Sequence, residues 1–410
     1  MNRPLKAGLQ LGNYELERKL GVGGMGEVWL AHPTVKGHRA SRVVIKRVHD
    51  HLARDPRITT LFEDELQLLQ RIEHPNIVRL YEGGQHEDEF FMAMEYIDGL
   101  DLHACLAAHD GPLWPAFAAA VIAQATIGLH HAHELKDLLG QKMNLVHRDI
   151  SPDNLLLDRH GNMKVVDFGI ARAETSQATT FAGTRKGKVR YMAPEYLVDA
   201  VQSPKTDVHS LGVSLWELVT GHQPFQGLHG PAVMREVVNV GLPRAKSVRP
   251  SVPDELDDVI AAAVAPAKKR LPTMKAFGDR LRDFLKEYPP PSPAEMGEEV
   301  SLWKRRMNES KVKLRLGGMR GQLESTEMVP VVEEPDTATM RRSAFDLVEG
   351  PPSVELRHAL DKTEFNVPLR TNEATDKLQV RSDDSSGSVK LPPDLEALAT
   401  RSRSKKKPPR

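Results

Sequence analysis

Three short polar motifs stand in a fixed order in the middle of the chain and limit what it can fold into. They read HRDISPDN at 147–154, DFG at 167–169 and APE at 193–195. Two short apolar strands, 155–157 and 163–166, are predicted between the first two motifs, on either side of a turn. The order and spacing of the motifs are too specific to have arisen by chance, so this segment points to one particular fold.

The N-terminal part of the chain predicts a small β-rich lobe with one helix. In the segment 57–72, apolar residues recur at three- and four-residue spacing, as they do on one face of a helix. The other segments are β-branched or alternate in polarity, which is typical of strands. The predicted strands are 14–20, 27–31, 41–48, 77–82 and 90–95.

After Gly99 the pattern becomes helical, which predicts a second and larger lobe. The longest of the predicted helices is rich in alanine and has no proline after its first turn. The predicted helices are 114–135, 206–220, 232–240, 254–265 and 273–286.

The C-terminal part of the chain has a different composition. Pro, Ser, Glu and Lys dominate, and the aromatic residues are only Trp303, Phe345 and Phe365. Such a segment buries too little apolar surface to offset the entropy lost on ordering. We therefore predict a largely disordered tail over 286–410, in which short helices near 295–307 or 393–399 could form.

Charge and cysteine content exclude some functions. The 56 Lys and Arg residues balance 56 Asp and Glu residues, so nothing argues for nucleic acid binding. The single cysteine, Cys105, cannot form an internal disulfide and fits a reducing compartment. No apolar run reaches transmembrane length and no signal peptide is evident, so we expect a cytoplasmic protein. The basic run 401–410 could bind a partner, although a solvated tail is the simpler interpretation.

A glycine-rich segment between two predicted strands matches the pattern GxGxxGxV. Glycines there would let backbone amides approach phosphate oxygens without an intervening Cβ atom. A tight hairpin is the alternative, and a dinucleotide fold is disfavoured because a strand, not a helix, follows the glycines. The candidate phosphate-binding residues are Gly21, Val22, Gly23, Gly24, Met25, Gly26 and Val28.

Lys46 ends an apolar strand eighteen residues after Val28. A lysine at this place could reach the α- and β-phosphates of a nucleotide under the glycine loop. The alternative is an edge lysine whose stem lies on apolar surface. Glu65, on the helix that follows, could hold the lysine in place by an ion pair, which favours the first interpretation.

Taken together, these motifs resemble the protein-kinase set of glycine loop, lysine, HRDxxxxN, DFG and APE. The sequence GGMGEV is similar to the bacterial branch of eukaryotic-like Ser/Thr kinases. The resemblance implies an α+β, two-lobed kinase fold: a β-rich N-lobe at 14–97, a mainly helical C-lobe at 98–285, and a short extension at 1–13. It also implies transfer of the γ-phosphate of ATP, with Mg²⁺, to Ser or Thr of protein substrates, with autophosphorylation of the activation loop. The alternative is a pseudokinase that acts as a scaffold.

The resemblance also implies roles for individual residues. Asp149 would accept the proton of the substrate hydroxyl, and Asn154 and Asp167 would bind Mg²⁺ through hard oxygen atoms. His147 is interpreted as a core residue near Phe168. Three further anchors are scaffold residues: Asp207 would cap the backbone of the catalytic loop, and Glu195 would pair with Arg270. Beyond the glycine loop and Lys46, the implied ATP contacts are Val28, Val44, Glu95, Ile97, Asp101 and Leu156.

Two positions depart from the family pattern. Ser151 stands where a lysine usually contacts the γ-phosphate, and Lys188 stands where a threonine is usual. We predict that Lys188 supplies the missing charge as a catalytic residue, while Ser151 bonds to Asp149. Two unrelated substitutions are the alternative, and Lys186 is the second candidate for the charge.

The activation segment also carries a predicted switch. Arg148 and Arg172 would repel each other unless a phosphate lay between them. Two histidine-rich clusters, at 130–133 and 103–109, are interpreted as ordinary helix positions rather than zinc sites. The candidate phosphorylation sites are Thr175, Ser176, Thr179, Thr180 and Thr184.

Overall fold

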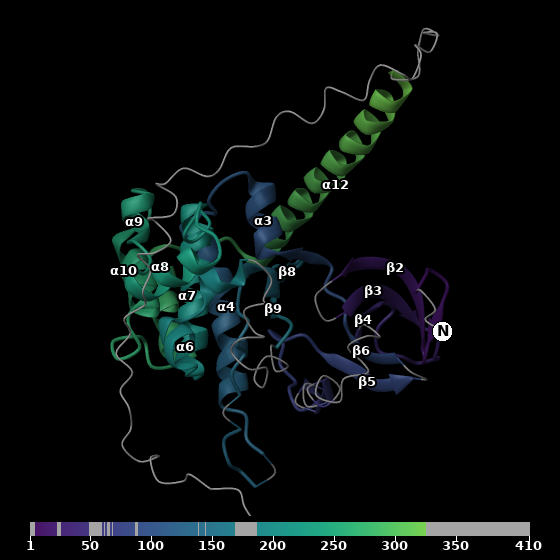
Figure 1. Ribbon diagram of the computed structural model, residues 1–410, viewed down its shortest axis with the longest axis horizontal. Coiled ribbons are helices and arrows are strands. Elements are labelled where there is room, and N and C mark those ends of the chain that lie inside the picture. The colour runs from purple at the N-terminus through teal and green to yellow at the C-terminus, as the bar shows by residue number, and fades with distance from the viewer. Residues whose placement is uncertain are drawn as a thin grey trace, which may run out of the picture. The chain divides into compact units, whose positions relative to one another are not determined.

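The computed structural model describes residues 5–22, 26–48, 60, 62–63, 66–67, 69–86, 89–137, 139–143, 145–168 and 187–324, with side chains described up to residue 309. These residues belong to one compact unit, 1–328. They form a β-rich N-lobe and a mainly helical C-lobe (Figure 1). The two-lobed architecture predicted from the sequence is confirmed.

The N-lobe is a six-stranded antiparallel sheet in the order β1-β2-β3-β4-β6-β5. Alternate residues of its strands are buried, for example Tyr14 and Leu16 in β2 and Val43 and Ile45 in β4, because successive side chains point to opposite faces. The strands are β1 (Gln10–Leu11), β2 (Tyr14–Val22), β3 (Gly26–Pro33), β4 (Val43–Val48), β5 (Leu80–His86) and β6 (Glu89–Glu95).

Two details of the N-lobe bear on the sequence-based expectations. The first strand, β1, lies in the segment 1–13 and buries Leu11 against the sheet, so this extension is part of the lobe. In the predicted helix 57–72, the described residues 60, 62–63, 66–67 and 69 are helical. Phe62, Leu66 and Leu69 are buried there, as their spacing predicts.

The C-lobe is built around two long helices, α4 (Pro115–His133) and α7 (Pro204–Thr220), in which most residues are buried. A small antiparallel sheet in the order β7-β8-β9 lies on the side of the N-lobe. Its strands are β7 (Gly99–Asp101), β8 (Leu155–Asp158) and β9 (Met163–Val165). The other elements are α3 (Leu102–His109), α6 (Pro194–Asp199), α8 (Pro231–Asn239), α9 (Ala245–Val248), α10 (Asp254–Val264), α11 (Met274–Glu287) and the 3₁₀ helices η1 (Pro152–Asn154) and η3 (Lys188–Tyr191).

The ends of α7 show why the sequence folds as it does. Pro204 occupies the first turn, where its missing amide costs nothing, and the hydroxyl of Thr206 donates to the carbonyl of Ser203. Gly221 ends the helix in the left-handed region with φ 74°, which favours glycine. Within the helix, a Cβ atom on Gly212 would lie 2.7 Å from the Cβ of Ala263, so glycine permits α10 to pack closely. The five predicted C-lobe helices are confirmed to within a few residues.

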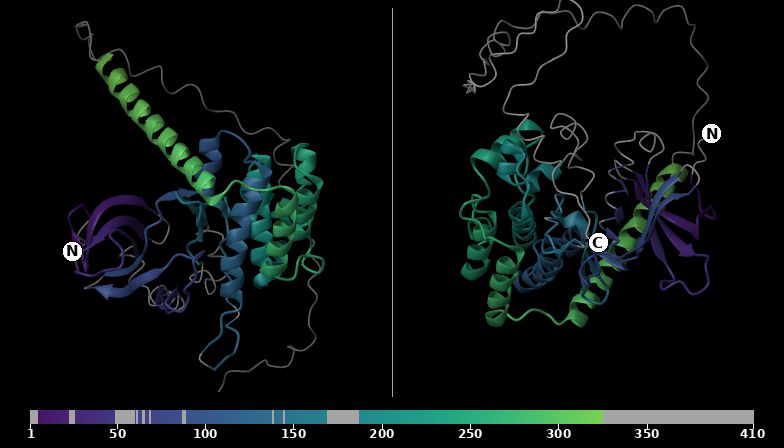
Figure 2. Two further views of the ribbon diagram at one scale, coloured as in Figure 1. Left: turned by 180° about the vertical axis from the view of Figure 1, so that it is seen from behind. Right: turned by 90° about the horizontal axis from the view of Figure 1, so that it is seen from below.

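The prediction of disorder from residue 286 onward is wrong for the start of this segment, because the fold continues into α12 (Pro293–Glu324). Met296, Val300 and Trp303 are 1–3% exposed and belong to the main hydrophobic core. The ring of Trp303 lies edge-on to Phe117 and His109, with centroids 5.5 and 5.7 Å apart. The first part of α12 packs beside α3, β7 and β8, near the junction of sheet and helices (Figures 1 and 2).

The physical reason for this correction is local. Averaged over 286–410 the composition is too polar to fold, but three apolar residues at spacings of four and three lie on one face of a helix. That face covers a part of the C-lobe that would otherwise be exposed. The short helix considered near 295–307 is therefore an integral part of the domain, and residues 325–410 lie outside the described residues.

No helix among the described residues is both long enough and apolar enough to cross a membrane.

We expect a chain shortened after Pro290 to be less stable than one shortened after Glu324. The first loses the buried side chains of α12 and exposes Phe117 and its neighbours. The free energy of unfolding should fall by at least about 3–5 kcal/mol, the usual effect of removing one large aromatic side chain from a core. Urea unfolding of the two chains measures this difference. Equal stabilities would show that α12 is not part of the folding unit.

Candidate active site

A buried carboxylate holds the loop 147–154 in place. Asp207, in α7, is 1% exposed, and its carboxylate accepts hydrogen bonds from the backbone amides of His147 and Arg148 at 2.7 and 3.0 Å. Nε2 of His133 lies 2.8 Å from the same carboxylate. Burial acts to raise the pKa of Asp207, but the bonds from His133 and His147 outweigh it and hold the pKa below its ordinary value. The capping role predicted for Asp207 is confirmed.

His147 is a core residue, as expected. Its ring stacks at an angle on Phe168, with centroids 4.6 Å apart, and Nε2 lies 3.0 Å from the carbonyl oxygen of Val166. Burial lowers its pKa, so the imidazole is neutral at physiological pH. It ties the loop to the segment that follows β9 and takes no part in chemistry.

Asp149 lies at the centre of a small polar cluster. Nζ of Lys188 is 2.6 Å from its Oδ2 atom, and the amide nitrogen of Asn154 donates to the same oxygen at 3.0 Å. Asn154 also donates to the backbone carbonyl of Asp149 at 2.7 Å. The side chains of Lys188 and Asp149 are only 8% and 10% exposed, so their attraction is poorly screened by water. The structure thus brings the two predicted catalytic residues into direct contact.

Ser151 does not play the part predicted for it. It is fully buried, and its hydroxyl finds no hydrogen-bond partner among the residues that the structure describes. The expected bond to Asp149 is absent, and the Oδ2 atom of Asp149 instead accepts from Asn154 and Lys188. The second candidate for the missing charge, Lys186, lies outside the described residues.

Asp167 and Lys46 form the second charged pair of the site. Lys46, in β4, places Nζ 2.9 Å from Oδ1 of Asp167, which follows β9, so the pair joins the two lobes. The positive charge of Lys46 holds the pKa of Asp167 below its ordinary value. Asp167 has φ 55°, a strained conformation for a residue other than glycine and one that recurs at functional sites. The predicted partner of Lys46, Glu65, lies outside the described residues.

The residues predicted to contact the nucleotide, together called the predicted nucleotide slot, come from both sheets. Val28 pairs with Lys46 across β3 and β4, and Val44 lies further along the same strand. Leu156 pairs with Asp101 across β7 and β8, which places these two at the opposite wall. Val28, Val44 and Leu156 are each half-buried, as expected for side chains that could also contact a base.

Two polar residues of the slot, Glu95 and Asp101, form hydrogen bonds within the protein. The Glu95 carboxylate accepts a hydrogen bond from Nζ of Lys164 at 2.7 Å, and the Glu95 backbone amide donates to the backbone carbonyl of Arg79. A base would therefore meet the backbone carbonyl of Glu95 and the neighbouring Ile97. Asp101 caps α3 by accepting from the amide of Ala104 at 2.7 Å, and burial raises its pKa. The predicted ribose contact would therefore come from a carboxylate that is held in place by a helix end.

The glycine loop is described only in part. Gly21 and Val22 end β2 as exposed residues, and Gly23, Gly24 and Met25 lie outside the described residues. Gly26 begins β3, where an added Cβ atom would lie 1.7 Å from the carbonyl oxygen of Arg47. This glycine is required by the close approach of β4, which is a role that the sequence pattern alone did not reveal.

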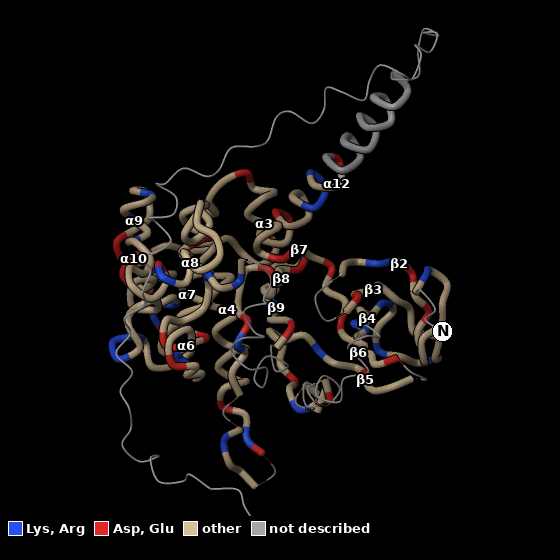
Figure 3. The backbone as a smooth tube through the Cα atoms, viewed as in Figure 1, with Lys and Arg blue, Asp and Glu red and all other residues tan. Residues whose placement is uncertain are grey.

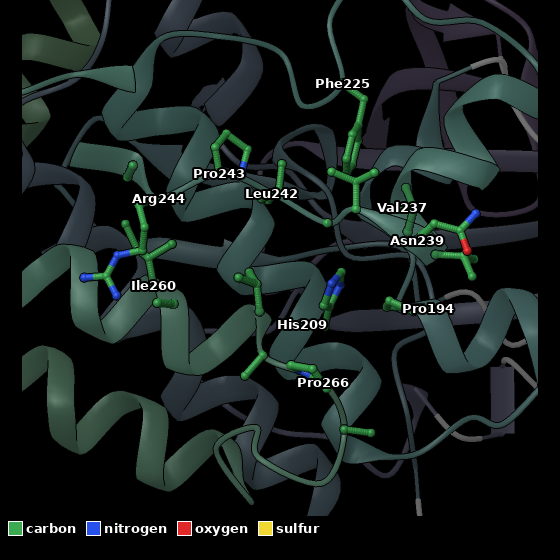
Figure 4. Close-up of a pocket in the computed structure, with 18 of the residues that line it drawn as sticks. Pro194, His209, Phe225, Val237, Asn239, Leu242, Pro243, Arg244, Ile260 and Pro266 are labelled. Atoms are coloured by element: carbon green, nitrogen blue, oxygen red, sulfur yellow. The ribbon is translucent and has the colours of Figure 1, made fainter. Parts of the chain in front are cut away.

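The APE motif is anchored as predicted. The guanidinium of Arg270 donates to both carboxylate oxygens of Glu195, at 2.5 and 3.1 Å, and the arginine side chain is fully buried. A cavity of about 580 Å³ lies beside this pair, among α6, α7, α8 and α10 (Figure 4). His209 lines this cavity, and its burial lowers the pKa of the imidazole to about 3. Neither Asp149 nor Asp167 lines this cavity, so the charged cluster and the cavity are separate features.

The sequence-based prediction missed His133 and Lys304. His133 was grouped with neighbouring histidines, although only it reaches Asp207. Lys304 lies in the segment expected to be disordered, yet it forms an ion pair with Asp98, in the linker 96–98 that joins β6 to β7. The helical spacing of Met296, Val300 and Trp303 was the signal that could have found it.

Known proteins resemble this chain in sequence and in fold. Residues 14–286 match the protein kinase domain family. The tyrosine-protein kinase MasK of Myxococcus xanthus is 40% identical over 283 residues, which cover 68% of this chain and 44% of MasK. The serine/threonine-protein kinase PrkC of Bacillus subtilis is 35% identical over 254 residues, covering 62% and 37%. The chain thus spans less than half the length of these relatives.

The fold comparison agrees. The crystal structure of the Mycobacterium tuberculosis PknI kinase domain superposes with a TM-score of 0.53 at 24% identity, covering 68% of this chain and 99% of that domain. A match at this identity shows the fold alone, while the family match covers the whole charged cluster around Asp149 and Asp167. The chain therefore belongs to the protein kinase family.

Proposed function

We propose that this chain transfers the γ-phosphate of ATP to serine and threonine hydroxyls of proteins, its own activation segment included. The observation that carries the proposal is the convergence of two charged pairs, Lys46 with Asp167 and Lys188 with Asp149, on the junction of the lobes. Phosphoryl transfer needs alignment and neutralisation of charge more than covalent help from the protein. A scaffold that had lost catalysis would have no need to keep all of these groups together.

The residues present fit a magnesium ion. Lys46 holds the pKa of Asp167 below its ordinary value, which favours the ionised form, and Asp167 offers hard carboxylate oxygens. The amide nitrogen of Asn154 faces Asp149, so its amide oxygen is the atom that could bind the metal. Bound there with the phosphates of ATP, Mg²⁺ would neutralise charge on the phosphate oxygens. Lys46 would then be shared between Asp167 and the phosphates.

Asp149 is suited to orient the attacking hydroxyl. Its carboxylate is almost buried, and its Oδ2 atom is held by the amide nitrogen of Asn154 and by Nζ of Lys188. A carboxylate so restrained needs little reorganisation when it accepts a hydrogen bond and then the proton of a substrate hydroxyl. The fold supplies this restraint through Asp207, which holds the preceding two residues.

Lys188 is the group best placed to replace the lysine that Ser151 displaces. It starts η3, a segment anchored by Arg190, which donates to the carbonyl oxygens of Pro224, Phe225 and Leu228 at 2.6–2.7 Å. The hydroxyl of Tyr191 donates to Glu217 at 2.6 Å and fixes the end of the same segment. A cation on such a rigid support can stabilise charge on the γ-phosphoryl group without reorganising.

Serine and threonine are the proposed acceptors, but one relative supports another choice. MasK, the most identical of the relatives reported above, is named a tyrosine kinase, whereas PrkC is named a serine/threonine kinase. After Asp149, the loop 147–154 carries neither the alanine and arginine of the tyrosine kinase version nor the lysine usual in serine/threonine kinases, so the choice of serine and threonine rests on the similarity to PrkC. Nε of Arg148 is buried and has no hydrogen-bond partner among the described residues, so it is a donor that a phosphate could satisfy.

We expect the purified full chain, with labelled ATP and Mg²⁺, to phosphorylate itself and a general protein substrate on serine and threonine. Asp149→Asn and Lys46→Ala should each abolish this while leaving the fold intact, because both side chains act on the reactants. Phosphoamino acid analysis identifies the acceptor, and mass spectrometry identifies sites between 175 and 184. Predominant phosphotyrosine would favour the alternative represented by MasK. Activity retained by Asp149→Asn would refute the catalytic assignment.

Lys188→Ala should lower kcat by at least ~10²-fold, the lower range for loss of one transition-state donor. ATP affinity should barely change, because the contact with the γ-phosphoryl group forms mainly in the transition state. The double variant Ser151→Lys with Lys188→Thr should recover much of the lost kcat, because the new lysine supplies the positive charge from the loop 147–154.

Steady-state kinetics with a fixed protein substrate measure both quantities, and Lys186→Ala serves as the matched control. If Lys188→Ala turns over normally, or if Lys186→Ala shows the larger loss, the assignment of the charge to Lys188 is incorrect.

A further inference from the structure

The linker between the lobes is held from outside the matched family region, by α12. Nζ of Lys304 pairs with the carboxylate of Asp98, and this contact is the main reason that the pKa of Asp98 is lowered. The backbone carbonyl of Asp98 also accepts from the amide of Arg159, at 3.0 Å, on the turn between β8 and β9. Figure 3 shows basic positions on the first part of α12 beside acidic positions around β7.

Helix α12 also contacts the C-terminal end of α3. Trp303, the largest fully buried side chain, lies edge-on to His109, the last residue of α3. The other end of α3 is capped by Asp101, the residue expected to meet the ribose. A rigid helix therefore connects the Trp303 contact to the nucleotide slot.

At the start of α12, the helix backbone closely approaches the backbone of the C-lobe. A Cβ atom on Gly161 would lie 2.2 Å from the carbonyl oxygen of Pro293, and one on Gly297 would lie 2.2 Å from that of Arg159. Glycine on both sides of the contact permits an approach that no other residue would tolerate without movement. This reciprocal fit indicates a built interface at the turn between β8 and β9, and β8 carries Leu156 of the slot.

We propose that residues 293–309 of α12 position the nucleotide site, with Trp303 and Val300 as positioning residues that set α3 and the linker. This inference rests on the proposed use of ATP. The apolar face carries most of the effect, since Lys304 and Asp98 are 37% and 44% exposed and such ion pairs contribute little. Loosening α12 releases Asp101 and the linker together, which weakens ATP binding while Asp149, Lys188 and Asp167 remain in place.

The test compares the same side-chain shortening, valine to alanine, at two buried positions. Val300→Ala acts on α12, whereas the control Val259→Ala acts on α10, which packs against α7 and α11; both valines are at least 94% buried. Because the same atoms are removed, both variants lose stability, but only Val300→Ala should weaken ATP binding, by about 2- to 10-fold. Trp303→Ala should weaken it by about 10-fold or more, and Trp303→Phe, which keeps a ring beside His109, should restore most of it.

The measurements are the Kd of a non-hydrolysable ATP analogue by calorimetry, and KM for ATP and kcat in the full chain. The expected pattern is a raised Kd and KM with kcat at saturating ATP little changed. Equal effects of Val300→Ala and Val259→Ala, or unchanged binding in Val300→Ala, would overturn the inference and leave α12 a purely stabilising element. If the unaltered chain binds the analogue without turnover, the proposed function fails, and the binding comparison still decides the role of α12.

Discussion

The geometry of the site depends on one buried carboxylate, that of Asp207. It accepts the amides of His147 and Arg148, and it does so at the place where Arg148 adopts φ 69°, a conformation that few residues other than glycine adopt. Without this acceptor, two backbone amides would be buried without partners, and an isolated buried donor is costly. The position of Asp149 therefore follows from a residue that lies almost sixty positions later in the chain.

Around this frame the charges are arranged in pairs. Lys46 and Asp167 come from different lobes, whereas Lys188 and Asp149 come from two segments of the C-lobe. Each lysine offsets a carboxylate in the absence of substrate and can stabilise a phosphate when one arrives. Lys188 places a positive charge beside Asp149, whereas the position of Ser151 carries none. Ser151 itself fills space in the core, and its hydroxyl has no hydrogen-bond partner among the described residues.

The role of α12 extends the domain beyond the region that matches the family. Its apolar face covers Phe117 and His109, and its first turn fits the turn between β8 and β9. These elements also form one wall of the predicted nucleotide slot. The stability of the C-lobe and the geometry of the slot thus share one set of contacts, which is why a segment remote from the catalytic motifs can influence ATP binding.

The sequence by itself determined the family, the two lobes and the five long C-lobe helices, and its motifs singled out Asp149, Asn154, Asp167, Lys46 and Lys188 as candidate site residues. These are local signals: spaced motifs, helical periodicity and residue types suited to one chemistry. Only the tertiary structure decided which partners these side chains have. That Lys188 contacts Asp149, that His133 rather than its neighbours reaches Asp207, and that Gly26 is needed by β4 all depend on segments distant in sequence. The role of α12 was hidden for the same reason, because a short apolar face in a polar segment gains its stability only from the surface that it covers.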